Sequence, residues 1–210
     1  AMKVVRDAFE RSGWRPGTWT AFYNEIVCES DARAASDPQR LDERLTIETP
    51  RTAPPEVAAI TRRVAVESRE AIAGALGVDW YRPVTVTIFL PDAAVDFIVG
   101  SYGYVSHKTG IDKICLPYHT VESRREASDA LLHEFAHVAT FELAQGEPPE
   151  WLDEGIATHF SHELSSRQAR FVISTAARTG RMLSLRRIDA ILNDSDERKE
   201  ERLLGFADGK

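Results

Sequence analysis

Apolar and polar residues follow two different rhythms along the chain, and each rhythm predicts its own kind of element. Alternation of apolar and polar residues at 45–49 predicts a short strand, and the segment VTVTIFL at 84–90 is the clearest strand of the sequence. Between them, residues 54–76 carry apolar residues at helical spacing and are followed by Gly77, a typical helix stop. These segments predict strand, helix and strand in that order.

Three further extended segments follow, separated by glycine or by a turn signal. They span residues 95–99, 102–106 and 111–116. Together with the two strands before them, they predict a small sheet with mixed strand directions.

The second half of the chain has helical periodicity. Ser123, with Glu126 three residues later, forms a capping-box pattern that opens an apolar helix running to about Gln145. Gly146 and the two prolines that follow it end this helix. Three more helices are expected, at 149–163, 165–180 and 184–193.

Residues 1–44 are charged and only loosely periodic, so we expect a helical N-terminal appendage there. Residues 45–210 then form one α+β domain, in which a small mixed sheet packs on the helix that begins near Ser123 and a helical C-terminal region follows. A chain of 210 residues is long enough for one sizeable core.

The composition excludes several classes of function. The net charge is −7, from 26 basic and 33 acidic residues, and this gives no basic surface for nucleic acid. No apolar run approaches the ~20 residues that span a membrane, and no signal peptide is visible. The two cysteines, Cys28 and Cys115, lack metal-site spacing and are expected to be small buried residues.

The segment HEFAH, from His133 to His137, lies in the middle of the apolar helix. Residues four apart on an α-helix differ by only ~40° in direction, so the two imidazoles project from one face, one turn apart. Glu134 stands beside them, where its carboxylate can take a proton from water without being a ligand. Zn²⁺ in such a site keeps an open position, lowers the pKa of its bound water towards ~7 and polarises a carbonyl. The segment therefore predicts a zinc site, against the alternative of ordinary helix histidines.

Two imidazoles cannot complete a tetrahedral site, so a third protein ligand has to come from elsewhere. Glu154 is well placed, because the proline break lets the next helix return antiparallel beside the histidines. Asp153 is its nearest rival, since neighbours on a helix point ~100° apart and only one of them can face the ion. Trp151 and Leu152 are expected to pack against the first helix, and Gly155 to allow close approach of the backbones. The alternative is that both carboxylates belong to a solvated helix start.

Together, HEFAH and the later EWLDEGIA resemble the gluzincin metallopeptidases, in particular the compact peptidase domains related to thermolysin and to the zinc aminopeptidases. Their pattern is HExxH followed by WLxEGxA. The resemblance covers residues 84–164 best and implies a zincin-like fold that hydrolyses peptide bonds in a peptide or protein substrate. It implies one zinc ion per chain, with His133, His137 and Glu154 as ligands. Glu134 would be the general base and polariser.

Three departures from related patterns bear on this function. Thr140 stands where a metzincin has glycine, and no histidine follows at the metzincin ligand position. No GxMEN-like segment precedes the metal helix, so an endopeptidase is favoured over an exopeptidase. Thr158 stands where thermolysin has an aspartate that supports a zinc ligand, so this role falls to Thr158 or to a neighbour.

Two other functions stay open at this level: a zinc-binding module without turnover, and a metallopeptidase that cleaves a repressor or another regulator. The intact Glu134 favours catalysis, and EWLDEG fits the regulator-cleaving class less well. A peptide substrate is expected to lie along a sheet edge between Tyr102 and Leu116, as an added strand.

A hydrogen-bond donor to the developing oxyanion is also expected, and relatives often supply it after the third ligand. All five tyrosines precede Glu154 in the sequence, and His159 would point some ~140° away from Glu154 on an ideal helix. The upstream candidates are Tyr104, His107, Tyr118 and His119. The alternative is a chain that continues past Lys210, which the apolar LLGF in the charged ending favours.

Overall fold

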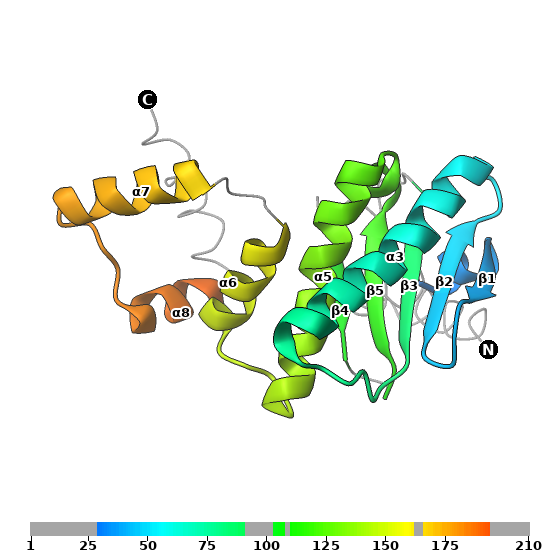
Figure 1. Ribbon diagram of the computed structural model, residues 1–210, viewed down its shortest axis with the longest axis horizontal. Helices are drawn as coiled ribbons and strands as arrows, with labels where there is room; N and C mark the ends of the chain where they lie inside the picture. The colour runs from blue at the N-terminus through cyan, green and yellow to red at the C-terminus, as the bar shows by residue number, and fades with distance from the viewer. Residues whose placement is uncertain (1–28, 91–102, 108–109, 162–165, 194–210) are drawn as a thin grey trace, which may run out of the picture.

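The computed structural model describes residues 29–90, 103–107, 110–161 and 166–193, and in them a five-stranded sheet lies beside a layer of helices (Figure 1). The strands are β1 (Ser36–Arg40), β2 (Leu45–Pro50), β3 (Val84–Phe89), β4 (Tyr104–Ser106) and β5 (Asp112–Pro117). The helices are α3 (Pro55–Leu76), the short 3-10 helix η1 (Tyr118–Val121), α5 (Arg124–Ala144), α6 (Glu150–Ser161), α7 (Ser166–Arg178) and α8 (Leu185–Asn193). The expected α+β class is confirmed.

The sheet has mixed strand directions, in the order β1-β2-β3-β5-β4. The three inner strands β2, β3 and β5 are parallel, whereas β1 and β4 pair antiparallel with their neighbours. All six residues of β3 are buried, including its two threonines, as is typical of an inner parallel strand. The strands expected around 45–49, 84–90, 102–106 and 111–116 are confirmed with small shifts of their ends, and the segment at 95–99 lies outside the described residues.

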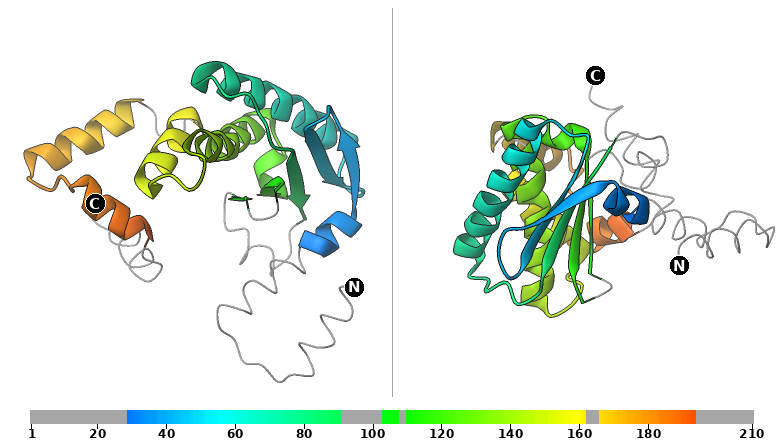
Figure 2. Two further views of the ribbon diagram at one scale, coloured as in Figure 1. Left: turned by 90° about the horizontal axis from the view of Figure 1, so that it is seen from below. Right: turned by 90° about the vertical axis from the view of Figure 1, so that its right-hand side faces the viewer.

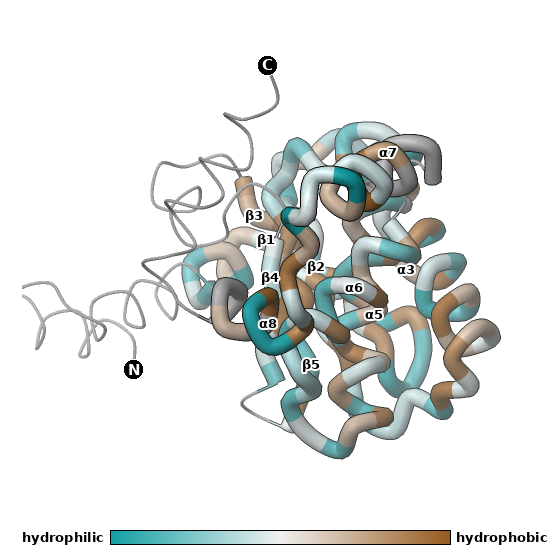
Figure 3. Tube along the Cα trace, turned by 90° about the vertical axis from the view of Figure 1, so that its left-hand side faces the viewer, coloured by the Kyte–Doolittle hydropathy of each residue, from teal (hydrophilic) through white to brown (hydrophobic). Residues whose placement is uncertain are grey.

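Helices α3 and α5 cover one face of the sheet, as Figure 2 shows. Val86 of β3, Ile114 of β5, Ile72 of α3 and Phe135 of α5 are all fully buried in the core between the two layers. Figure 3 shows apolar stretches on these strands and helices. α3 ends where its sequence predicted, because Gly77 takes the left-handed conformation with φ of 71°.

The N-terminal part of the described chain differs from expectation. Residues 29–34 are helical, as expected, but residues 36–40 form strand β1, and residues 1–28 lie outside the described residues. β1 is an edge strand with only Ser36 buried, so it has no apolar alternation, and its Pro38 is tolerated at an edge. Pairing with β2 and a 2.9 Å hydrogen bond from Arg51 Nη1 to the Ser36 carbonyl hold it in the sheet. The sheet therefore begins before the expected boundary at residue 45.

The helices after the sheet layer agree with the expected segments. α6 packs beside α5, α8 contacts α6, and α7 lies apart from the sheet layer (Figure 1). None of the described helices is long and apolar enough to cross a membrane.

Asp42 holds the turn between β1 and β2. Its Oδ1 accepts hydrogen bonds from the backbone N–H groups of Arg44 and Leu45 at 2.7 and 2.8 Å, and its Oδ2 accepts one from Arg69 of α3. The hydrogen bond from Arg69, helped by the backbone N–H groups, outweighs burial and lowers the pKa of the Asp42 carboxyl to about 2.

Asp42→Ala is expected to lower the free energy of unfolding at pH 7 by about 1 kcal/mol, since the lost hydrogen bonds are charge-assisted but partly exposed. The pKa of this carboxyl lies below its ordinary value of 3.8 in the folded protein. The stabilisation is therefore present above about pH 4 and is lost as the pH falls towards 2. Urea unfolding at several pH values measures this, with Glu43→Ala as the neighbouring control. A difference from wild type that stays constant down to about pH 2 would contradict the assignment.

Candidate metal centre

The rotation of α5 is fixed by its start and by its buried face. Ser123 Oγ accepts a hydrogen bond from the Glu126 N–H at 3.2 Å, which is the N-cap that the sequence predicted. Leu131 and Phe135 are fully buried against the sheet layer. The helix ends at Gln145, which takes the left-handed conformation with φ of 56° in place of the expected glycine. With this rotation, the side of α5 that carries the two histidines faces α6.

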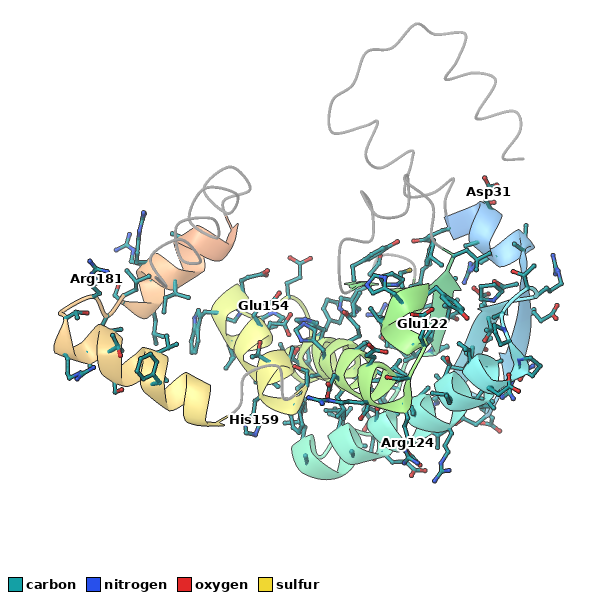
Figure 4. The ribbon with its side chains drawn as sticks, turned by 90° about the horizontal axis from the view of Figure 1, so that it is seen from above. Asp31, Glu122, Arg124, Glu154, His159 and Arg181 are labelled. Carbon is teal, nitrogen blue, oxygen red and sulfur yellow. The ribbon has the colours of Figure 1, made fainter. Side chains whose placement is uncertain are left out.

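α6 packs beside α5, and Figure 4 shows Glu154 on it next to that helix. Ala157 of α6 is fully buried, and Ile156 and Phe160 pack against the core. The expected close approach at Gly155 is wrong, because nothing lies within 4 Å of a Cβ added there, and Leu152 is 38% exposed. The reason is helical periodicity, because Gly155 lies two residues from the buried Ala157 and points to the opposite side of α6.

The structure brings His133, His137 and Glu154 together. One ligand atom of each lies within 4.8 Å of those of the other two. The Nε2 atoms of the two imidazoles are 3.1 Å apart, and His133 Nε2 is 3.8 Å from Glu154 Oε2. All three side chains are partly buried. This is the group that the sequence predicted as ligands.

The spacing of this group fits a small metal ion. Two nitrogen ligands at ~2.0–2.1 Å from a tetrahedral ion stand ~3.3 Å apart, close to the observed distance between the imidazoles. Glu154 Oε2 lies 3.8 Å from His133 Nε2 and the widest separation in the group is within 4.8 Å, so the carboxylate would move towards the imidazoles to reach the same ion. The group could therefore hold a metal ion.

Asp153 faces the other nitrogen of His137. Its Oδ2 lies 2.7 Å from His137 Nδ1, and its Oδ1 accepts a hydrogen bond from the Thr140 hydroxyl. An aspartate in this position selects the imidazole tautomer with the proton on Nδ1 and leaves Nε2 to bind a metal. Asp153 therefore supports a candidate ligand instead of competing with Glu154. The supporting role expected of Thr158 or a neighbour falls to Asp153.

The two imidazoles have opposite electrostatic environments. Burial, together with the charge of His137, lowers the pKa of His133 to about 4. Burial also lowers the pKa of His137, but the hydrogen bond and charge of Asp153 and the charges of Glu134 and Glu154 outweigh it, and the pKa is raised to about 9. The negative charges of these carboxylates therefore stabilise the protonated form of His137, whereas burial and the charge of His137 favour the neutral form of His133.

Glu134 lies on the side of α5 that turns towards the sheet. Its residue is only 3% exposed, and a Cβ added at Gly103 would stand 3.1 Å from its Oε1. Gly103 directly precedes β4, so the carboxylate reaches the end of that strand. The charge of this buried carboxylate helps to raise the pKa of His137, so Glu134 lies near a candidate ligand.

Two of the four candidate oxyanion donors have other side-chain partners. The Tyr104 hydroxyl donates to Glu29 Oε1 at 2.9 Å, and its ring packs with Phe89 and Cys115, which belong to a cluster separate from the main core. His107 Nδ1 bonds Asp112 Oδ1 at 2.9 Å. These contacts occupy the Tyr104 hydroxyl and one ring nitrogen of His107.

Tyr118 and His119 both lie in η1, just before α5 begins. Tyr118 is partly buried against the main core and His119 is exposed. The described contacts assign neither side chain to the metal group, so the oxyanion donor stays a prediction.

Sequence reasoning missed Gly103, Asp112 and Phe141. The His107 ring stacks on Phe141 of α5 with 3.8 Å between centroids and 7° between planes. Phe141 follows His137 by four residues, so helical spacing alone placed it on the histidine side of α5. The other two make their contacts across the sheet, and local sequence carries no signal for those.

Comparisons of the chain with protein-family models, with curated proteins and with solved structures find no match. The residues of the site therefore carry the argument about function.

His133→Ala and His137→Ala are each expected to lower the affinity for a divalent metal ion at least 100-fold, because each removes one of three candidate ligands. Elemental analysis after dialysis and competition titration with a chelator measure this. His159→Ala, an exposed histidine of α6, is the matched control and should retain the metal. Full metal retention in His137→Ala would exclude the site.

Asp153→Asn is expected to weaken metal binding by only about 10- to 100-fold, because it disturbs the imidazole partner and removes no ligand. Glu154→Gln should weaken it more. The two variants are compared in one chelator titration, with circular dichroism to show that both fold. The reverse order of affinities would make Asp153 the ligand.

Proposed function

We propose that the chain is a zinc peptidase of the gluzincin type, with a zincin-like fold, that hydrolyses internal peptide bonds. The observation that carries the proposal is the group formed by His133, His137 and Glu154 on two packed helices, with the buried Glu134 beside it on α5. A metal site with only a structural role has no need of a buried carboxylate at that position. The order of sheet, metal helix and returning helix also agrees with this class.

The donor set favours zinc. Two imidazole nitrogens and one carboxylate oxygen hold one ion in several catalytic zinc sites and leave a fourth position for substrate or water. When bound, zinc supplies Lewis-acid chemistry, since it makes a water more acidic and polarises a carbonyl. Asp153 keeps the His137 imidazole in the orientation that such a site needs.

Glu134 moves the proton in this proposal. One of its carboxylate oxygens takes a proton from the attacking water, and the same carboxyl then gives it to the nitrogen of the leaving amine. Burial keeps bulk water away from the carboxylate, so the proton passes between defined partners. The reaction consumes one water and releases a carboxylate and an amine.

The sheet edge favours an extended peptide as substrate. Of the two strands expected to form this edge, β5 lies between β3 and β4, so β4 is the outer strand of the described sheet. A peptide that pairs with β4 as an added strand would bring its backbone past Gly103 to Glu134. Such pairing recognises main chain on both sides of the cleaved bond, which favours an endopeptidase.

Glu134→Gln is expected to keep zinc and to lose turnover about 10²- to 10⁴-fold, because the amide preserves shape and cannot accept the proton. Zinc content and hydrolysis of a broad peptide library are measured on the same preparation.

Glu122→Gln, an exposed carboxyl near the start of α5, is the control and should behave as wild type. Wild-type protein that holds zinc and cleaves no peptide would favour the zinc-binding module instead, and full turnover in Glu134→Gln would refute the proposed base.

A further inference from the structure

The first end of β4 lies against the candidate base. Gly103 has φ of 129°, a conformation that residues with a side chain rarely adopt. A Cβ there would stand 2.7 Å from the Cys115 carbonyl oxygen, 2.7 Å from Leu116 Cδ2 and 3.1 Å from Glu134 Oε1. The carbonyl belongs to the β5 backbone and cannot turn aside. Only glycine therefore lets this end of β4 approach both β5 and the Glu134 carboxylate.

The second end of β4 lies against α5 one turn beyond the histidines. The His107 ring stacks on Phe141, and its Nδ1 bonds the buried Asp112. Arg82 donates to the His107 carbonyl at 2.9 Å, lies 3.2 Å from Asp112 Oδ1 and stands over the Phe141 ring. His107 is thus held through its ring face, through one ring nitrogen and through its backbone.

The two attachments follow the same direction along the helix. From Gly103 to His107 an extended chain covers ~13 Å, and from Glu134 to Phe141 a helix rises ~10 Å. Between them, Val105 packs against the main core. The edge strand and the metal helix are therefore held side by side over this whole length.

We propose that Gly103 and His107 are positioning residues that fix the edge strand β4 on the metal helix, Gly103 at the Glu134 carboxylate and His107 at Phe141. The proposal rests on the proposed function, because it takes Glu134 as the base and β4 as the strand that binds peptide. It adds that two contacts, one at Gly103 and one at His107, fix the distance between a bound peptide backbone and the base. Movement of either point would misplace the base relative to the peptide.

The first test replaces Gly103 by alanine. The variant should retain wild-type zinc content, because no ligand is touched, and lose about 10- to 100-fold in kcat through misplacement of Glu134. In a Glu134→Gln background, the same replacement should change the residual turnover less than about 2-fold, since its effect passes through that carboxylate. An equal loss in both backgrounds would show a merely structural role and overturn the assignment. Gly74→Ala is the control, because nothing lies within 4 Å of its added Cβ.

The second test measures hydrogen exchange of the β4 amides and needs no activity. His107→Ala and Phe141→Ala should each speed exchange by about 10-fold, and the double variant should add little, because both remove the same stack. His159→Ala should change nothing. Unchanged exchange in His107→Ala would overturn the attachment of β4 at Phe141. This test does not depend on whether Gly103→Ala folds.

The two tests separate the inference from the function on which it rests. Wild-type protein without zinc or without hydrolysis would refute the proposed function, and the exchange measurement would still decide whether β4 is fixed on α5. Zinc-dependent hydrolysis with wild-type kcat in Gly103→Ala would refute the positioning role alone. In an active enzyme, His107→Ala should raise KM for peptides about 10-fold at unchanged zinc content, and an unchanged KM would count against the role of His107.

Discussion

One helix has to serve two surfaces at the same time, and the candidate site depends on this. α5 buries Phe135 against the sheet layer while it presents His133 and His137 towards α6. The same helix also holds the buried Glu134, whose carboxylate lies near the first end of β4. Phe135 meets Trp80 edge to face at 5.8 Å, a contact that resists any roll of the helix about its axis. A roll would exchange the surroundings of the carboxylate and the imidazoles.

The second helix divides its two adjacent carboxylates between two tasks. Asp153 reaches the Nδ1 side of His137, whereas Glu154 reaches the side where the two Nε2 atoms meet. Both contacts depend on the orientation of α6, which Ala157 and its neighbours fix by packing on the core. Apolar residues that are not candidate ligands thus determine which carboxylate faces which imidazole nitrogen.

Local pattern was sufficient for most of the fold and for the three candidate ligands. The buried strand β3, the helix stop at Gly77 and the cap at Ser123 all have their cause within a few residues of chain. β1 gives no such signal, since only Ser36 of this strand is buried and its sequence lacks alternation. The glycine of EWLDEG suggested a close approach that depends on which way α6 turns, and that expectation for Gly155 was wrong.

The same distinction applies to the site. The spacing of the histidines and the short link to α6 made their meeting with Glu154 predictable. The role of Asp153 was not, because a difference of one residue in helix orientation decides which carboxylate faces which nitrogen. Gly103 and Asp112 act across strands that are distant in sequence, so only the folded chain shows what they contact.

The buried cysteine of β5 gives this arrangement a chemical readout. Cys115 is 1% exposed, burial raises the pKa of its thiol, and its carbonyl oxygen is the atom that crowds the Gly103 position. A thiol in that state reacts with alkylating reagents only after the strands separate, because both ionisation and access need water. The rate at which native protein loses this thiol to such a reagent therefore reports how often the sheet opens beside the metal helix.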